Sequence, residues 1–356
     1  MASEAWRNVA TGTTRPWIGA GAFVATVGVI AALQAHLVVR AVDEAWEYRD
    51  AGAAVTILDA PTAISAAQCD ALAETPGIVA SGAVREGPHV RVAADLSVEQ
   101  ITLEASPGFA GLLHTERAGS SPSDGVWVSE TMASRFGVRA GSPGIALVQG
   151  GDIPLAGIFA WPDDGRDPSL GFSIVSPVAP VGLFDSCWIE TWPEGSQRDL
   201  ARLAIDQSGG VDAARGATTR QLNATLGTSF DGPARYRSIP AWPLTAAACA
   251  AAFATGFTLV RVRRLSLASA LHAGLAKATL AVQLLMETVW WLIPALALSA
   301  AGTWGVASHG NPDSTWAAAY PGLRCLLLAA IVALTGSLTA ALATRERHLF
   351  RYFKAR

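Results

Sequence analysis

The side chains in this sequence that could do chemistry are charged groups at the borders of apolar segments. Arg261, Arg263 and Arg264 end one apolar segment, and Lys277 opens the next. Glu287 follows about ten residues later, roughly 15 Å along a helix at 1.5 Å per residue. A carboxylate at that depth in an apolar segment costs a few kcal/mol, so it should have a specific purpose. The chemistry indicated is ion pairing and partner binding.

Motifs for covalent catalysis are absent from the sequence. It contains no GxxxxGK[ST] phosphate loop, no GxSxG, no HExxH and no recognisable carboxylate pair. The four cysteines form neither a CxxC pair nor a Cys/His cluster with metal-ligand spacing. We therefore expect a protein that is not an enzyme and has neither metal nor cofactor, with any ATP bound and hydrolysed by a partner subunit.

The composition is that of a membrane protein with a soluble insert. Of 356 residues, 51% are hydrophobic and only 15% are charged, and the mean hydropathy is +0.33. Both values are unusual for a soluble domain. The net charge of −3, and basic residues that cluster beside apolar segments instead of forming a groove, exclude a nucleic-acid partner.

Four segments are long and apolar enough to cross a bilayer, which takes about 20 residues. They cover residues 17–40, 241–260, 278–303 and 324–344. A cleaved signal peptide is the alternative for the first, but its apolar run is longer than the usual core of about 7–15 residues. Basic flanks place residues 1–16, 261–277 and 345–356 in the cytoplasm, and residues 41–240 and 304–323 outside. The expectation is a multi-pass protein of the cell membrane with both termini inside.

The region 41–240 has the pattern of a large α/β extracytoplasmic domain. Strands are predicted at 53–58, 78–85, 153–159 and 186–192, with a helix over 64–74. Ser129 is a candidate N-cap for a helix over 130–136. Further helical patterns occupy 197–207 and 218–226, before the chain returns to the membrane.

Two stretches resemble the MacB/FtsX family of ABC-transporter permeases, the type VII or mechanotransmission class. The phrase Val126–Gly141 resembles a stretch of that family's β-rich sabre subdomain. Residues 261–287 resemble its coupling loop in layout, with Ala270–Ala273 in the place of the family's turn, or, after a two-residue slip, with Gly274 on its glycine and Glu287 on its glutamate. The acid that usually follows the basic residues is replaced in either register, by Arg264 or Ser266.

The resemblance implies fold, sites and partners. Residues 50–95 and 180–235 would form a porter-like subdomain, and 96–179 a sabre-like one. A dimer with a second permease copy or a homologous permease is implied, together with a separate ABC ATPase subunit, membrane lipid, and an extracytoplasmic protein or lipoprotein as a further partner. Glu287 would be an intramembrane carboxylate, either paired or a protonated packing residue. The residues expected to couple to the ATPase are Arg263, Arg264, Leu267, Leu271, His272 and Gly274.

The implied function is a permease that couples ATP hydrolysis by its partner to motion of the outer domain. That motion would drive export or extraction of a substrate at the outer side of the membrane. Two alternatives stay open: FtsX-like signalling across the membrane to a cell-wall hydrolase, and a degenerate adaptor half of a heterodimeric permease. The adaptor remains an alternative because the acid usual in the coupling loop is missing.

A disulfide between Cys69 and Cys187 is also expected, because these are the only cysteines outside the apolar segments. The predicted topology puts them in an oxidising compartment. Cys69 would lie on the first helix of the porter-like unit, and Cys187 on the strand that returns to it. Two buried free thiols are the alternative.

Overall fold

The computed structural model describes residues 15–96, 99–113, 115–117, 125–193, 196–206 and 216–345. The chain divides into two units. A helical unit combines residues 1–44 with 233–356, and a sheet unit comprises residues 45–232. Almost all of the expected cytoplasmic segments 1–16 and 345–356 lies outside the described residues.

The described residues contain four helical stretches with the length and composition needed to cross a membrane. The first runs continuously from Pro16 to Asp50, as α2 (Pro16–Phe23), a π-helical turn η1 (Val24–Gly28) and α3 (Val29–Asp50). The others are α7 (Gly232–Ser238) with α8 (Ala241–Val262), α10 (Lys277–Ser308) and α11 (Thr315–Ala343). The predicted multi-pass fold, with an α/β domain between its first two spans, is confirmed.

The helices extend beyond the apolar segments that predicted them. The first continues past residue 40 to Asp50, and α11 begins at Thr315 and not at 324. The connection before α11 is correspondingly shorter than the predicted loop 304–323. Ser314 explains the early start, because its side chain accepts a hydrogen bond from the amide of Ala317. The alanines that follow are strong helix formers.

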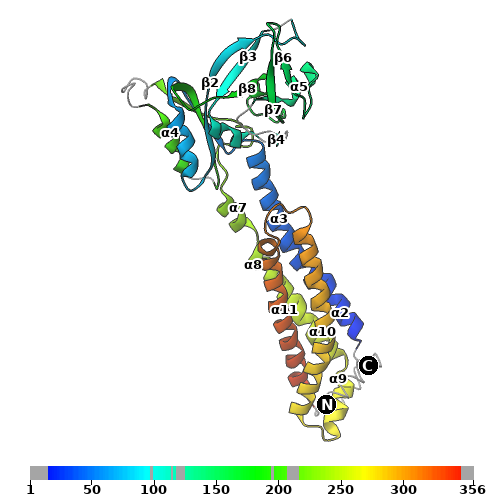
Figure 1. Cartoon of the computed structure of the whole chain (residues 1–356). Helices are drawn as coiled ribbons and strands as arrows, with labels where there is room; N and C mark the ends of the chain where they lie inside the picture. Colours follow the sequence, from blue (N-terminus) through cyan, green and yellow to red (C-terminus); the bar gives the residue numbers. More distant parts are fainter. Residues whose placement is uncertain are drawn as a thin grey trace. The chain divides into compact units, whose positions relative to one another are not determined.

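Helices α8 and α11 lie side by side in the helical unit and approach closely through glycines (Figure 1). A Cβ atom on Gly256 would collide with the carbonyl oxygen of Ala333, and one on Gly336 with that of Phe253. The Ser337 hydroxyl donates to the Gly256 carbonyl at 3.2 Å. Backbone contact of this kind is how apolar helices associate without a hydrophobic driving force.

The sheet unit contains a ten-stranded mixed sheet in the order β10-β1-β9-β2-β3-β8-β5-β7-β4, with β6 paired to β7. The central strand β9 pairs antiparallel with both β1 and β2, as expected for the strand that returns after a long excursion. The sheet therefore continues from residues 50–95 and 180–235 into residues 96–179, through the antiparallel pair β2 and β3. The strands are β1 (Val55–Ser65), β2 (Ile78–Val90), β3 (Gln100–Ala105), β4 (Thr115–Arg117), β5 (Val126–Ser129), β6 (Gly144–Ala146), β7 (Asp152–Phe159), β8 (Ile174–Pro177), β9 (Leu183–Thr191) and β10 (Thr218–Gln221).

Short helices cover the sheet. They are α4 (Ala66–Ala71), α5 (Glu130–Phe136) and four 3₁₀ segments, η2 (Leu72–Glu74), η3 (Pro107–Leu112), η4 (Pro168–Phe172) and η5 (Ser196–Ala204). Ser129 caps α5 as predicted, because its hydroxyl accepts the amide of Met132. The helix predicted over 64–74 starts later, because Ile64 still pairs in β1.

The helix predicted over 218–226 is wrong. Thr218–Gln221 forms the edge strand β10, antiparallel to β1. Two adjacent threonines favour an extended backbone, and pairing with the long strand β1 outweighs the helical period that the sequence suggested. The pattern at 197–207 produces the 3₁₀ segment η5 instead of an α-helix.

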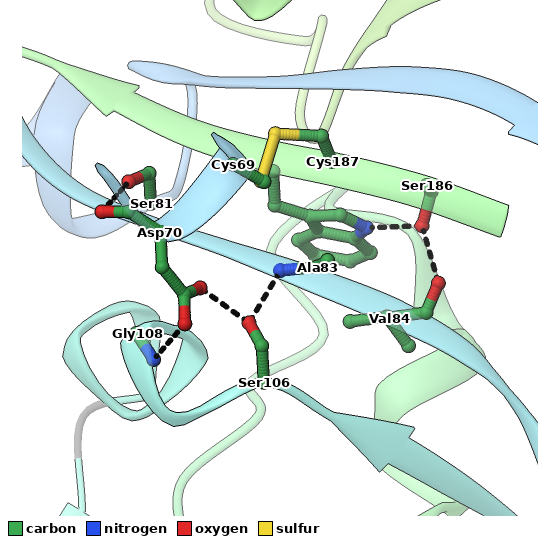
Figure 2. The surroundings of a disulfide bond; sticks show 10 residues. Cys69, Asp70, Ser81, Ala83, Val84, Ser106, Gly108, Ser186 and Cys187 are labelled. Atoms are coloured by element: carbon green, nitrogen blue, oxygen red, sulfur yellow. Dashed lines mark hydrogen bonds between the residues drawn. A yellow bond between two sulfur atoms is a disulfide. The ribbon is translucent and has the colours of Figure 1, made fainter. Parts of the chain in front are cut away.

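The predicted disulfide between Cys69 and Cys187 is confirmed (Figure 2). Their Cα atoms are 5.9 Å apart, within the range of about 4.4–6.8 Å that a disulfide spans. It joins α4 to the central strand β9, and both residues are fully buried. The adjacent carboxylate of Asp70 accepts hydrogen bonds from the Ser106 hydroxyl and the Gly108 amide. Burial raises the pKa of Asp70 despite these two bonds.

Candidate functional site

The turn between α8 and α10 is a short helix held at both ends by non-helical residues. Helix α8 ends at Val262, and α9 (Arg264–His272) begins directly after Arg263. Gly274 has φ +93°, in the left-handed region that favours glycine. Lys277 then starts α10. Glycine at this position lets the chain reverse from α9 into α10 within four residues.

Glu287 forms an ion pair with the turn. The Arg263 Nη1 atom donates to Glu287 Oε2 at 2.6 Å, and the two side chains are 19% and 4% exposed. Gln283, one turn earlier on α10, donates to the other carboxylate oxygen at 3.4 Å. Such a pair is costly to break, because removing one member leaves a charge buried without its counter-charge. The structure thus contains the paired form of the two readings of Glu287.

Two of the predicted coupling residues face the interior. Leu267 and Leu271 pack with Val260, Leu280 and Leu284 in one buried cluster. Their spacing of four places them on the same face of α9. This face packs the turn against α8 and α10, so neither leucine is on the exposed surface of the turn.

The opposite face of the turn is exposed and polar. Ser266, Ser269 and His272 share it at helical spacing, and Gly274 and Lys277 are exposed just beyond it. Arg264 is half-buried at the start of α9. The exposed surface of the described turn therefore combines hydroxyls, an imidazole, a glycine and an ammonium group with the apolar side chains of Val262, Ala273 and Ala276. Ser266 and Ser269 were not among the residues that the sequence singled out for coupling.

Buried polar contacts elsewhere in the helical unit were also missed. The Gln34 amide on α3 donates to the Thr245 hydroxyl on α8 at 3.2 Å, and both side chains are buried. Between α10 and α11, the Thr288 hydroxyl donates to the Ser337 hydroxyl at 3.0 Å. Gln34 was visible in the sequence as an interruption of an apolar run, whereas no periodicity marks threonine or serine as an interhelical donor.

The sheet unit holds the carboxyl end of α3 with two polar side chains. The Arg166 Nη2 atom donates to the carbonyl of Asp50 at 2.7 Å, and the Asn223 amide donates to that of Ala51 at 3.0 Å. The carbonyls at a helix end lack intrahelical partners, so these donors satisfy groups that would otherwise need water. Arg166, itself buried, also forms a two-pronged ion pair with Asp164. The hydrogen bond from Arg166 holds the pKa of Asp164 below its usual value.

Among the described residues, no group of three or more His, Cys, Asp or Glu side chains could hold a metal ion. The described residues thus provide a turn that is apolar on its inner face and bonded to α10 through Arg263 and Glu287, and a sheet unit whose Arg166 and Asn223 donate hydrogen bonds at the carboxyl end of α3.

Comparison with known proteins gives structural likenesses only. No protein-family profile and no curated protein matches the sequence. The periplasmic region of MacB from Actinobacillus actinomycetemcomitans is similar over 49% of this chain and 91% of its own length, with 8% identity and a TM-score of 0.35. The extracellular domain of the noncanonic ABC-type transporter YknZ from Gram-positive bacteria is similar over 47% of this chain and 100% of its own length, with 12% identity and a TM-score of 0.32.

Proposed function

We propose that this chain is the permease subunit of an ABC transporter, paired with a second permease and driven by a separate ATPase. ATP hydrolysis on the partner moves the turn 261–277, and the helices carry that motion to the sheet unit. The moving sheet unit then drives export or extraction of a substrate at the outer side of the membrane. In this arrangement both termini and the turn are cytoplasmic.

The observation that carries the proposal is the two-sided construction of the turn. Its inner face is fixed by Leu267 and Leu271, and by the ion pair of Arg263 with Glu287. Its outer face presents Ser269 and His272 to solvent. A surface loop without a partner needs no buried ion pair to hold its orientation. A loop that another protein pushes needs such a pair, because force applied to its exposed face must reach α10 without bending the turn.

Continuity of the first helix supports the second half of the proposal. The helical stretch from Pro16 to Asp50 passes without a break from the helical unit into the sheet unit. Its end is bonded there by Arg166 and Asn223. A helix is stiff over such a length because each residue adds a backbone hydrogen bond. In the proposal, this helix is the element that carries displacement from the membrane to the sheet unit.

Co-purification of an ATPase tests the proposal. The full chain carrying Ser269→Glu and His272→Glu alters only exposed residues of the turn. Ser308→Glu with His309→Glu is the matched control, since it places the same two acids on exposed residues at the other end of α10. We expect the control to retain a co-purifying ATPase and the turn variant to lose it. Equal recovery from both variants would refute docking at the turn.

A further inference from the structure

One arginine of the helical unit lies at the start of an apolar segment without a carboxylate beside it. Arg324 is on α11, followed by the apolar run 325–344, and its side chain is exposed. Within the described part of the chain, no carboxylate lies at ion-pair distance from Arg324. An arginine keeps its proton and therefore its positive charge. An anion that pairs with Arg324 would come from outside the described chain.

The neighbour that Arg324 does have is an exposed indole. Its guanidinium carbon lies 5.4 Å from the centroid of the Trp242 ring, at the start of α8. Trp242 is 72% exposed and Arg324 is exposed as well, so the indole does not enclose the guanidinium. A guanidinium presents N–H groups that match the oxygens of a phosphate in a two-pronged contact.

The position of this pair along the helices places it at the level of lipid headgroups. Between Arg324 and Arg345 the apolar run is about 30 Å long at 1.5 Å per residue, which is the thickness of a bilayer's hydrocarbon core. Between Trp242 and Arg261 the distance on α8 is similar. Exposed Trp304, Trp316 and Tyr320 lie toward the same end of α10 and α11, as aromatic residues do at a membrane interface.

The surface below Arg324 suits an acyl chain. Leu327, Leu328 and Ile331 follow Arg324 by three, four and seven residues, and therefore share its face of α11. All three are exposed, to 65%, 38% and 60%. A cation over an exposed apolar stripe is complementary to a molecule with an anionic head and an apolar tail.

We propose that Arg324 and Trp242 form a binding site for the phosphate headgroup of a membrane phospholipid, with its acyl chains on Leu327, Leu328 and Ile331. The phosphate oxygens accept hydrogen bonds from the guanidinium and supply the missing counter-charge. This site requires only that the chain spans a bilayer, and it is independent of any partner ATPase.

Native mass spectrometry of the purified full chain in detergent tests the site with two probes. Dioleoyl phosphatidylglycerol carries the phosphate, and dioleoylglycerol has the same chains without it. We expect the chain to retain phosphatidylglycerol and to bind dioleoylglycerol at least about tenfold more weakly, given the strength of charged hydrogen bonds. Equal binding of the two lipids would overturn the proposal. So would displacement of bound phosphatidylglycerol by inorganic phosphate at millimolar concentration, which would indicate a site for a free anion.

Variants with matched controls separate this site from general attraction to anionic lipid. Arg324→Gln and Trp242→Leu should each weaken phosphatidylglycerol binding, the first by about tenfold or more. Arg40→Gln is the control for charge, because exposed Arg40 ends the first apolar segment but has no aromatic ring contact among the described residues. Trp316→Leu is the control for the ring. Both controls should bind lipid as the unaltered chain does.

Two results with these variants would contradict the site. One is an equal loss of lipid in Arg40→Gln and Arg324→Gln, which would indicate unspecific attraction. The other is unchanged lipid binding together with loss of self-association in Arg324→Gln, which would assign this face to a second copy of the chain. Trp242→Leu is the variant least expected to misfold, because Trp242 is exposed and Arg324 stays in place.

Discussion

At the scale of single residues, the ion pair of Arg263 with Glu287 is the contact on which the orientation of the turn depends. Glu287→Gln keeps the shape of the side chain and removes its charge, so Arg263 loses its counter-charge in a largely buried place. We expect a loss of about 3 kcal/mol in the free energy of unfolding. Chemical unfolding of the full chain in detergent measures it.

The matched control is the exposed pair of Arg235 with Glu44, in the same unit, at 3.0 Å and with side chains 60% and 37% exposed. Glu44→Gln should cost less than about 1 kcal/mol, because solvent already screens that pair. An equal effect of the two substitutions would mean that the buried pair does not orient the turn.

Two carboxylates of the sheet unit predict opposite effects of pH. Arg166 lowers the pKa of Asp164, so Asp164 adds stability above its unfolded pKa and loses it as the pH falls through the folded value. Burial raises the pKa of Asp70, so its contribution is present below the unfolded pKa and is lost as the pH rises through the folded value.

Substitution by asparagine separates these two contributions. The cost of Asp164→Asn in unfolding temperature should therefore shrink between pH 7 and pH 3, and the cost of Asp70→Asn should grow over the same interval. Thermal unfolding of both variants of the full chain across that range measures the trend. Parallel pH profiles for the two variants would contradict the environments described for the carboxylates.

At the scale of elements, the close approach of α8 and α11 predicts that replacing one helical glycine by alanine lowers stability, contrary to the usual effect. Replacing a helical glycine by alanine normally stabilises a helix by about 0.5–1 kcal/mol. At Gly256 the added Cβ would collide with the carbonyl oxygen of Ala333, whereas at Gly302 of α10 nothing lies within 4 Å. We expect Gly302→Ala to raise the unfolding temperature and Gly256→Ala to lower it. Stabilisation by both would show that α8 and α11 are farther apart.

Much of the element order could be predicted because membrane segments are defined by length and apolar composition alone. Strands β2 and β7 were found from the runs 78–85 and 153–159, although β2 continues to Val90. The helix ends were less predictable. Asp50 and Thr315 lie outside the apolar runs, where local capping and contacts with other segments decide where a helix stops.

The charged residues of the candidate site could be predicted from the sequence, but which of its side chains face inward could not. Sequence spacing placed Glu287 inside an apolar helix, but Arg263, its partner, is separated from it by the whole turn. Leu267 and Leu271 were grouped with His272 for coupling, although only contacts with α8, α10 and α11 reveal that they face inward. Likewise, the sequence pattern over 218–226 predicts a helix, and only the pairing of β10 with β1 shows that Thr218–Gln221 is a strand.

At the scale of the whole molecule, the proposed topology predicts which parts of the chain face which side of the membrane. Gln149 is exposed in the turn between β6 and β7, and Ser266 is exposed on α9. In a chain with Cys249→Ala and Cys325→Ala, the remaining native cysteines are held in the disulfide. A thiol reagent that cannot cross membranes should label Gln149→Cys on intact cells and Ser266→Cys only after lysis. The reverse pattern would invert the topology.

The central claim is that a separate ATP-hydrolysing protein docks on the exposed side of the turn, and photocrosslinking tests it most directly. A photoreactive amino acid at position 272 would sit on that side, and one at position 286 would sit on an exposed apolar face of α10. After irradiation of cells, we predict a crosslink from position 272 to a protein that contains a GxxxxGK[ST] phosphate loop, and none to such a protein from position 286. The claim is contradicted if position 272 captures no such protein, or if both positions capture it equally.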